Sequence, residues 1–218
     1  HTDGAAATRA QARFGVARGH QDVVGLPIGT GLGAGVHIGG RPLQTRNPSA
    51  GVSFGHATID TGGATCLCGN IGCAETLVSA NAVVGRMRDY VARKVPSTIT
   101  DAYHHDPGGI TFRTLVEGVD AGDRVAQEVL QHFCRDLGAT IVTAIHAYDP
   151  EVVVLAGGPM AQADHFLPQV QAYVDRYAFR YPKDRFIPIR RAERSDHAGV
   201  LGAVARVMQT VADAAPTS

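Results

Sequence analysis

The amino-acid sequence predicts an α/β fold built around a mixed sheet. Two short apolar runs that flank a glycine-rich turn predict a β-hairpin near the start of the chain. Farther along, long helical patterns alternate with buried strands, an arrangement typical of parallel strand pairs. A hairpin followed by helix-linked strands therefore favours a sheet with both antiparallel and parallel pairs.

The first half of the chain is expected to contain the hairpin and two helices. Alanine-rich sequence favours a helix, and Asp3 stands just before such a segment, where an acidic residue suits an N-cap. A short apolar run bounded by turn residues predicts a buried strand. The expected elements are a helix over 4–16, strands over 23–28 and 36–38, a helix over 75–94, and a loop over 96–109.

The second half carries the clearest helical pattern, over 123–148, which ends at Asp149-Pro150 because the residue before a proline disfavours helical geometry. Apolar residues recur in this helix every four positions and predict one buried stripe. The stripe consists of Val125, Val129, Phe133, Leu137, Ile141 and Ile145. The other expected elements are a short helix over 111–118, a strand over 151–155, a helix over 167–177, a strand over 186–190, and a last helix that begins near Asp196.

Size and charge exclude some classes of function. The chain has 218 residues and 22.9 kDa, enough to bury a core. Its 20 basic residues balance 20 acidic ones, so no global field favours nucleic acid or a membrane surface. No apolar run approaches membrane-spanning length, and a soluble cytoplasmic protein is expected. The chain begins at His1 without a methionine and enters helical sequence at once, which favours a piece of a longer protein.

A cysteine cluster is the strongest local signal. Cys66, Cys68 and Cys73 lie within eight residues, and His56 stands upstream of them. Three thiolates and one imidazole make a complete tetrahedral zinc set of the structural type. The alternative is a disulfide loop, but three cysteines cannot pair evenly, and nothing in the chain indicates secretion. The fourth cysteine, Cys134, falls in a helical apolar pattern and is expected to be a small buried hydrophobe.

Two glycine segments follow predicted strands. Gly29, Thr30 and Gly31 could approach a phosphate, because glycines expose backbone N–H groups and the threonine adds a hydroxyl donor. No Gly-Lys-Ser/Thr follows, so this is not a Walker loop, and a tight hairpin turn is the alternative. Gly157 and Gly158 could floor a nucleotide pocket or form a strand-to-helix turn.

Two carboxylates are candidate site residues. Asp3 could act as a general base, since a carboxylate can accept the proton of an attacking hydroxyl, although a simple helix cap fits the local sequence as well. Glu75 stands two residues after Cys73 and could bind a ligand hydroxyl. Its alternative is an exposed glutamate at a helix start.

Together, these motifs resemble the ROK family (repressors, open reading frames and sugar kinases). The family's zinc motif G-H…C-x-C-G-x-x-G-C-x-E matches Gly55-His56 and the segment from Cys66 to Glu75. Its G-T-G-x-G-x-G loop matches 29–35, its D-P-E-x-V-V-x-G-G segment is similar to 149–158, and its D-A-x-x-G-A ending is similar to 196–203. The segment Asp60-Thr61-Gly62-Gly63-Ala64-Thr65 is similar to the D-x-G-G-T phosphate loop of actin-like ATPases, but it lies in the connection from His56 to Cys66 and is set aside.

The resemblance implies the actin-like, ribonuclease-H-type ATPase fold. Residues 1–218 would be its C-terminal lobe, with the zinc segment over 56–75, and the N-terminal lobe would lie outside this chain. The implied reaction is transfer of the ATP γ-phosphoryl group to a sugar hydroxyl, with Mg²⁺ accompanying ATP. Without the N-terminal lobe, the chain alone is expected to have no kinase activity.

The resemblance also implies roles for particular residues. Asp3 would be the catalytic base, Glu75 would bind the sugar, and His56 would bind both zinc and the sugar. Zinc would be structural, with His56, Cys66, Cys68 and Cys73 as its ligands. The remaining implied contacts are those of Gly29, Thr30 and Gly31 with the ATP phosphates, and of Gly157 and Gly158 with the nucleoside.

Some positions depart from the family pattern. Thr2 replaces the usual asparagine, Gln11 stands where glutamate is common, and 50–56 lacks the sugar-binding glutamate of A-G-E-x-G-H. These departures favour the alternative, the sugar-sensing domain of a ROK transcriptional repressor, whereas Asp3 favours a kinase. The resemblance further implies a homodimer or tetramer, and DNA as a partner if a helix-turn-helix lies upstream.

Overall fold

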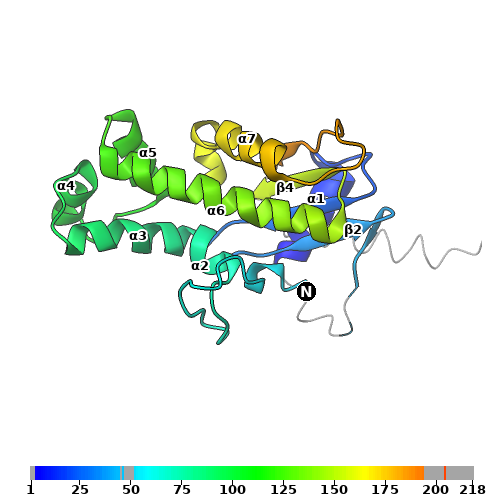
Figure 1. The fold of residues 1–218 in the computed structure, drawn as a ribbon, viewed down its shortest axis with the longest axis horizontal. Coiled ribbons are helices and arrows are strands. Elements are labelled where there is room, and N and C mark those ends of the chain that lie inside the picture. Colours follow the sequence, from blue (N-terminus) through cyan, green and yellow to red (C-terminus); the bar gives the residue numbers. More distant parts are fainter. Residues whose placement is uncertain (1–2, 45, 47–51, 194–203, 205–218) are drawn as a thin grey trace, which may run out of the picture.

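The computed structural model describes residues 3–44, 46, 52–193 and 204. They form a five-stranded mixed sheet with helices packed around it (Figure 1). Its strand order is β3-β2-β1-β4-β5. The central strand β1 pairs antiparallel with β2 and parallel with β4, so the predicted mixed sheet is confirmed. The strands are β1 (Val23–Pro27), β2 (Gly35–Ile38), β3 (Arg41–Pro42), β4 (Val152–Ala156) and β5 (Ile189–Arg191).

Helices cover both faces of the sheet. One face packs on α1 (Asp3–Phe14), which lies behind the strands in Figure 1. Gly25 and Gly35 meet Thr8 of this helix so closely that a Cβ on either would lie 2.1 or 2.3 Å from the Thr8 hydroxyl oxygen. The opposite face, which includes Leu26 and Leu155, joins the main core under α6 (Arg124–Tyr148).

The core is centred on α6, whose predicted stripe is fully confirmed as buried. Beside it pack α5 (Phe112–Asp120) and α7 (Leu167–Tyr177), as Figure 1 shows. Phe112, Phe133 and Phe166 meet edge to face with ring centroids 5.0–5.7 Å apart, a geometry that aromatic quadrupoles favour. Cys134 is buried here, which raises the pKa of its thiol to about 12, and it is the expected small core residue.

Two helix predictions need correction. The single helix expected over 75–94 is two helices, α2 (Ala74–Val78) and α3 (Ala80–Ala92). Between them Ser79 leaves helical geometry, and its hydroxyl caps α3 by accepting a hydrogen bond from the Ala82 N–H at 3.1 Å. Within the loop expected over 96–109, the structure forms α4 (Thr98–His105), which is capped by Ser97.

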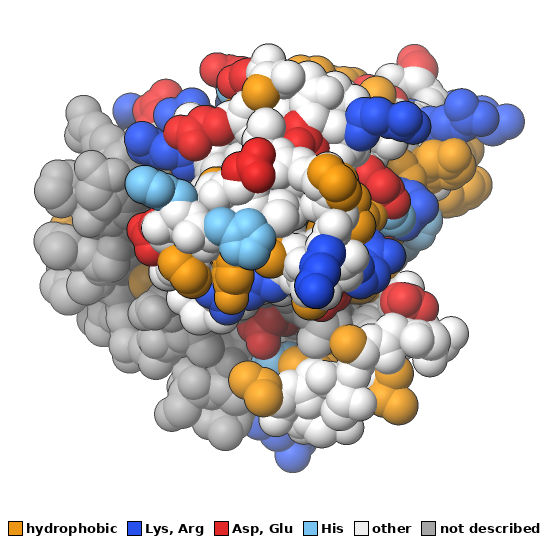
Figure 2. Space-filling model, turned by 90° about the vertical axis from the view of Figure 1, so that its left-hand side faces the viewer, with side chains coloured by type: hydrophobic (Ala, Val, Ile, Leu, Met, Phe, Trp, Pro, Cys, Tyr) orange, Lys and Arg blue, Asp and Glu red, His pale blue; other side chains and the backbone are white. Residues whose placement is uncertain are grey.

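The remaining elements lie close to their expected bounds. The strand expected over 186–190 begins only at Ile189, and Phe186 is largely exposed. The helix expected near Asp196 lies outside the described residues. In the part of the chain that the structure describes, no helix is both long enough and apolar enough to span a bilayer. The end that carries α4 and α5 faces the viewer in Figure 2, where acidic and basic side chains are interspersed.

One histidine is buried between the sheet and α1. His37 of β2 is 5% exposed, and its Nδ1 has no hydrogen-bond partner among the described residues. Burial, together with the positive charge of Arg9 on α1, lowers the pKa of His37 from 6.5 to about 4. The folded protein therefore keeps this imidazole neutral at pH values where the unfolded chain protonates it.

We expect His37 to make the protein less stable in mild acid. The unfolded chain takes up the proton below pH 6.5, and the folded chain takes it up only near pH 4. His37 therefore does not lower the free energy of unfolding above pH 6.5, and lowers it progressively as the pH falls from 6.5 to 4. The loss is about 3 kcal/mol. Urea denaturation between pH 4.5 and 7.5 should show a smaller decline for His37→Phe, while replacement of the exposed His105 by alanine should keep the wild-type decline. Equal declines in all three proteins would contradict the assignment.

Candidate functional site

The predicted glycine loop lies at the end of β1, at the centre of the sheet. It forms the tight turn that was the alternative interpretation, since Gly29 donates to the Gly31 carbonyl at 2.9 Å and Gly33 donates to the Pro27 carbonyl at 3.0 Å, and phosphate binding by this turn stays a prediction. Ile28 and Leu32 also form an isolated antiparallel bridge. These bonds fold the loop back on itself before the chain enters β2.

The second glycine segment meets the first at the same sheet edge. Because β1 and β4 are parallel, their carboxyl ends lie side by side, and the Ile28 N–H donates to the Ala156 carbonyl at 2.8 Å. Gly157 has a φ of +100°, and a Cβ there would lie 1.9 Å from the Ile28 carbonyl oxygen. Only glycine fits this conformation and this approach. Gly158, in contrast, begins the 3₁₀ segment η2 (Gly158–His165) and faces open space.

The start of α1 lies against the glycine loop. A Cβ on Gly4 would lie 2.7 Å from the Ala34 nitrogen, and one on Gly33 would lie 3.3 Å from the Gly4 Cα. Asp3 is the first residue of this helix, so its backbone is next to the loop. The structure describes only the backbone of Asp3, and whether its carboxylate acts as a base stays a prediction.

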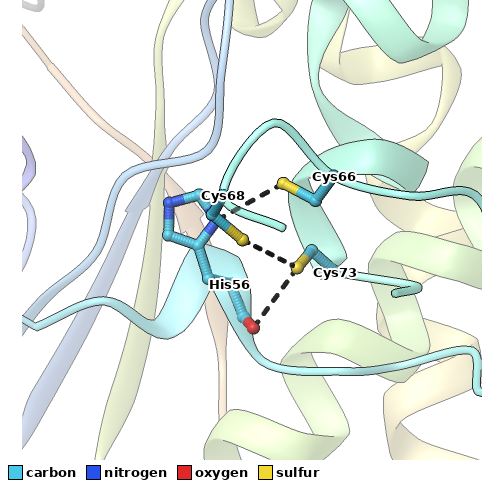
Figure 3. Close-up of side chains that lie close together, drawn as sticks. All are labelled: His56, Cys66, Cys68 and Cys73. Carbon is cyan, nitrogen blue, oxygen red and sulfur yellow. Dashed lines mark hydrogen bonds between the residues drawn. The ribbon is translucent and has the colours of Figure 1, made fainter. Parts of the chain in front are cut away.

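The predicted metal ligands converge (Figure 3). One donor atom each from His56, Cys66, Cys68 and Cys73 lies within 4.8 Å of every other. Cys68 Sγ and Cys73 Sγ are 3.7 Å apart, and Cys66 Sγ is 3.6 Å from His56 Nδ1. A tetrahedral zinc site with bonds of about 2.3 Å to sulfur and 2.0–2.1 Å to nitrogen has separations of about 3.8 and 3.6 Å. These distances show that the donor set fits a metal ion. The three cysteines of the cluster are free thiols, as is Cys134, so no disulfide loop forms.

The loop between the ligands is shaped by its own hydrogen bonds. The backbone N–H of Cys66 donates to the Asn70 carbonyl at 2.7 Å. The Asn70 side chain donates to the His56 carbonyl at 3.2 Å and to Cys73 Sγ at 3.5 Å. The backbone at Asn70 lowers the pKa of the Cys68 thiol, whereas burial raises the pKa of Cys73 to about 11. A bound metal would favour the thiolate at every position.

Glu75 joins the metal segment to the glycine loop. Its Oε2 accepts a hydrogen bond from the Leu32 N–H at 2.9 Å, and a Cβ on Gly31 would lie 2.3 Å from the same oxygen. The alternative of an exposed glutamate at a helix start is therefore wrong. Leu32 was not among the predicted residues, because its contribution is a backbone N–H and leaves no signal in the side-chain pattern.

Gln11 has a structural explanation. Its amide nitrogen donates to the Glu193 carbonyl at 2.6 Å, while its oxygen accepts from the N–H groups of Val16 and Glu193 at 3.3 Å. A carboxylate could not donate the first of these bonds. Gln11 therefore connects α1 to the segment after β5. Of the other two departures, Thr2 lies outside the described residues, as do positions 50 and 51, whereas 52–56 is described and leads into a 3₁₀ turn in which Phe54 and Gly55 are buried.

Comparisons of this chain with a family model and with curated proteins agree on one family. The family model described as ROK family matches residues 1–210. The regulator NagC of Escherichia coli is 29% identical over 91% of this chain and 47% of its own length. The glucokinase of Halalkalibacterium halodurans is 32% identical over 86% of this chain and 56% of its own length. The chain thus spans about half the length of these curated relatives.

Solved structures agree with this result. The glucokinase of Streptomyces griseus, in complex with glucose and AMPPNP, has a TM-score of 0.83 and 27% identity, covering 96% of this chain and 67% of its own. A homologue of the E. coli MLC protein has a TM-score of 0.81 and 29% identity, covering 97% of this chain and 51% of its own. The predicted actin-like ATPase fold is confirmed.

Replacing Gly157 should cost far more stability than replacing its neighbour. In Gly157→Ala a Cβ must enter at positive φ against the Ile28 carbonyl, which we expect to lower the free energy of unfolding by about 3 kcal/mol. Gly158→Ala is the matched control and should change stability by less than about 0.5 kcal/mol. Urea denaturation checks both, and equal stabilities would contradict the close approach.

Proposed function

Since the chain belongs to the ROK family, we propose that it is the C-terminal lobe of an ATP-dependent sugar kinase. The proposed enzyme transfers the γ-phosphoryl group of ATP to a hydroxyl of a hexose or amino sugar. The lobe that completes the ATP site is proposed to lie in the part of the protein outside this chain. The lengths of the curated relatives support this proposal, because the chain matches only about half of each.

The observation that carries the proposal is the convergence on the glycine loop. The start of α1, the carboxylate of Glu75 and the turn at Gly157 all contact the residues that join β1 to β2. Phosphoryl transfer depends mostly on positioning and on stabilising charge. A site that gathers a candidate base, a sugar-binding carboxylate and backbone N–H donors around one loop meets this requirement.

Each group then has a distinct role. Asp3 accepts the proton of the attacking sugar hydroxyl. Glu75 and His56 hold the sugar, with His56 using Nε2 because its Nδ1 faces the cysteines. Gly29, Thr30 and Gly31 cradle the ATP phosphates, whose charge Mg²⁺ partly neutralises; Thr30 and Gly31 supply the donors, because the Gly29 N–H is bonded to the Gly31 carbonyl. Gly157 and Gly158 lie under the nucleoside.

Zinc is the proposed metal at the cysteine cluster. Three sulfurs and one imidazole are the donors that zinc prefers in structural sites, and four protein ligands leave no open position for a substrate. Bound zinc supplies rigidity rather than a reactive group. It would hold the loop that carries His56 and Glu75.

The alternative is the sugar-sensing domain of a ROK repressor. NagC, a DNA-binding regulator, is as similar to this chain as the kinases are, and the sequence of 50–56 lacks the glutamate of the family pattern. Sequence-specific DNA binding by the full-length protein, relieved by a sugar, would favour the repressor over the kinase.

Asp3→Asn should abolish most of the activity of the full-length protein. Loss of a general base lowers kcat by roughly 10²–10⁴-fold, while the KM for the sugar should change little. A coupled assay of ADP release with a panel of hexoses and amino sugars measures both constants. Asp101→Asn, an exposed carboxylate on α4, should retain activity within about twofold. Full activity of the Asp3 variant would contradict its assignment as the base.

The protein should bind one zinc ion per chain. Cys68→Ser removes a ligand and should release the metal, which elemental analysis after gel filtration would measure. Cys134→Ser is the matched control, since it removes a cysteine from the core of α6 and leaves the cluster intact. Equal zinc content in the two variants would contradict the ligand assignment.

A further inference from the structure

We infer that Glu75 and the metal segment clamp the glycine loop, so that metal and sugar binding are transmitted to the nucleotide phosphates. The inference rests on the proposed function and assigns Glu75 a second task, as a positioning residue for the loop. The metal would then be required for nucleotide binding as well as for the sugar site.

Three contacts make up the clamp. The Leu32 N–H donates to Glu75 Oε2 at 2.9 Å, and the Ala80 N–H at the start of α3 donates to the Gly29 carbonyl at 2.9 Å. The third is steric, because a Cβ on Gly55 would lie 2.1 Å from the Leu32 carbonyl oxygen. The loop is therefore held at the Gly29 carbonyl and at both the N–H and the carbonyl of Leu32.

Two of the three contacts come from segments next to the metal ligands, and the third, from Ala80, lies one short helix farther along the chain. Gly55 directly precedes His56 in the 3₁₀ turn η1 (Phe54–His56), and Glu75 follows Cys73 by two residues at the start of α2. The two ligand segments are joined by the Ala74 N–H, which donates to the Ala57 carbonyl at 2.9 Å. A metal ion bound to His56 and Cys73 would fix both sides of the clamp together.

The two oxygens of the Glu75 carboxylate can bind the loop and the sugar at the same time. The hydrogen bond with Leu32 uses Oε2, which leaves Oε1 for a sugar hydroxyl. A hydrogen bond to a charged acceptor is stronger than one to a neutral acceptor. Since Glu75 would bind the sugar and the loop together, each ligand should favour binding of the other, and this coupling must be reciprocal.

The first experiment measures the loop itself, by hydrogen exchange of the full-length protein followed at the Leu32 amide. Glu75→Ala, and removal of zinc with a chelator, should each speed exchange there by about tenfold or more. Glu75→Gln keeps an acceptor oxygen but loses its charge, so exchange at Leu32 should fall between that of the wild type and that of Glu75→Ala. Glu151→Ala is the matched control, because Glu151 accepts from the N–H groups of Gln21 and Asp22 at the opposite end of β1. It should speed exchange at those two residues and leave Leu32 unchanged.

The second experiment measures the affinity of the same proteins for a non-hydrolysable ATP analogue by calorimetry without sugar. Glu75→Ala and zinc removal should weaken binding by about tenfold, Glu75→Gln should weaken it less, and Glu151→Ala should leave it unchanged. Unchanged Leu32 exchange in a folded Glu75→Ala protein would overturn the clamp. A wild-type protein that binds no nucleotide would instead overturn the proposed function, and Leu32 exchange would still decide for or against the clamp.

Discussion

The parallel pairing of β1 with β4 is the constraint on which the rest of the site depends. It runs in register from Val23 and Val152 to Pro27 and Ala156, and both strands are buried almost throughout. Because a parallel ladder places both carboxyl ends at one edge, it fixes the two glycine segments beside each other although they are far apart in the chain. A slip of one residue would turn the faces of β4 over and separate the segments.

The metal segment is the part of the site that this sheet cannot stabilise. Cys66 and Cys73 are buried, but Leu67 is fully exposed and Ile71 is about half exposed, so the loop has few apolar side chains to pack. Small units without a core commonly depend on a metal or on disulfides. A metal ion bound by the four convergent ligands would therefore explain how an irregular loop can hold His56 and Glu75 in a defined place.

The sequence predicted most of the sheet and the metal cluster, for physical reasons. Strand patterns, the stripe on α6 and the cysteine spacing are local signals carried by side chains. α4 was missed because one short turn of apolar residues, around Ile99, gives no sustained period. The break at Ser79 was missed because a cap inside a continuous apolar pattern shows only in the backbone geometry. The contact of Glu75 with Leu32 could not be predicted, since its donor is a main-chain N–H that every residue but proline carries.

The clamp also bears on why kinases and repressors share this scaffold. A sugar bound at Glu75 and His56 would act on the loop between β1 and β2, and the same loop lies against Gly4 at the start of α1. In a kinase, a change in the position of this loop would alter its contacts with the phosphates of a bound nucleotide. In a repressor, the same shift would be felt by α1, whose far end is tied through Gln11 to the segment after β5. Under this proposal, one hydrogen-bonded carboxylate would suffice to transmit sugar binding beyond the sugar site, and what packs against the loop would decide which partner responds.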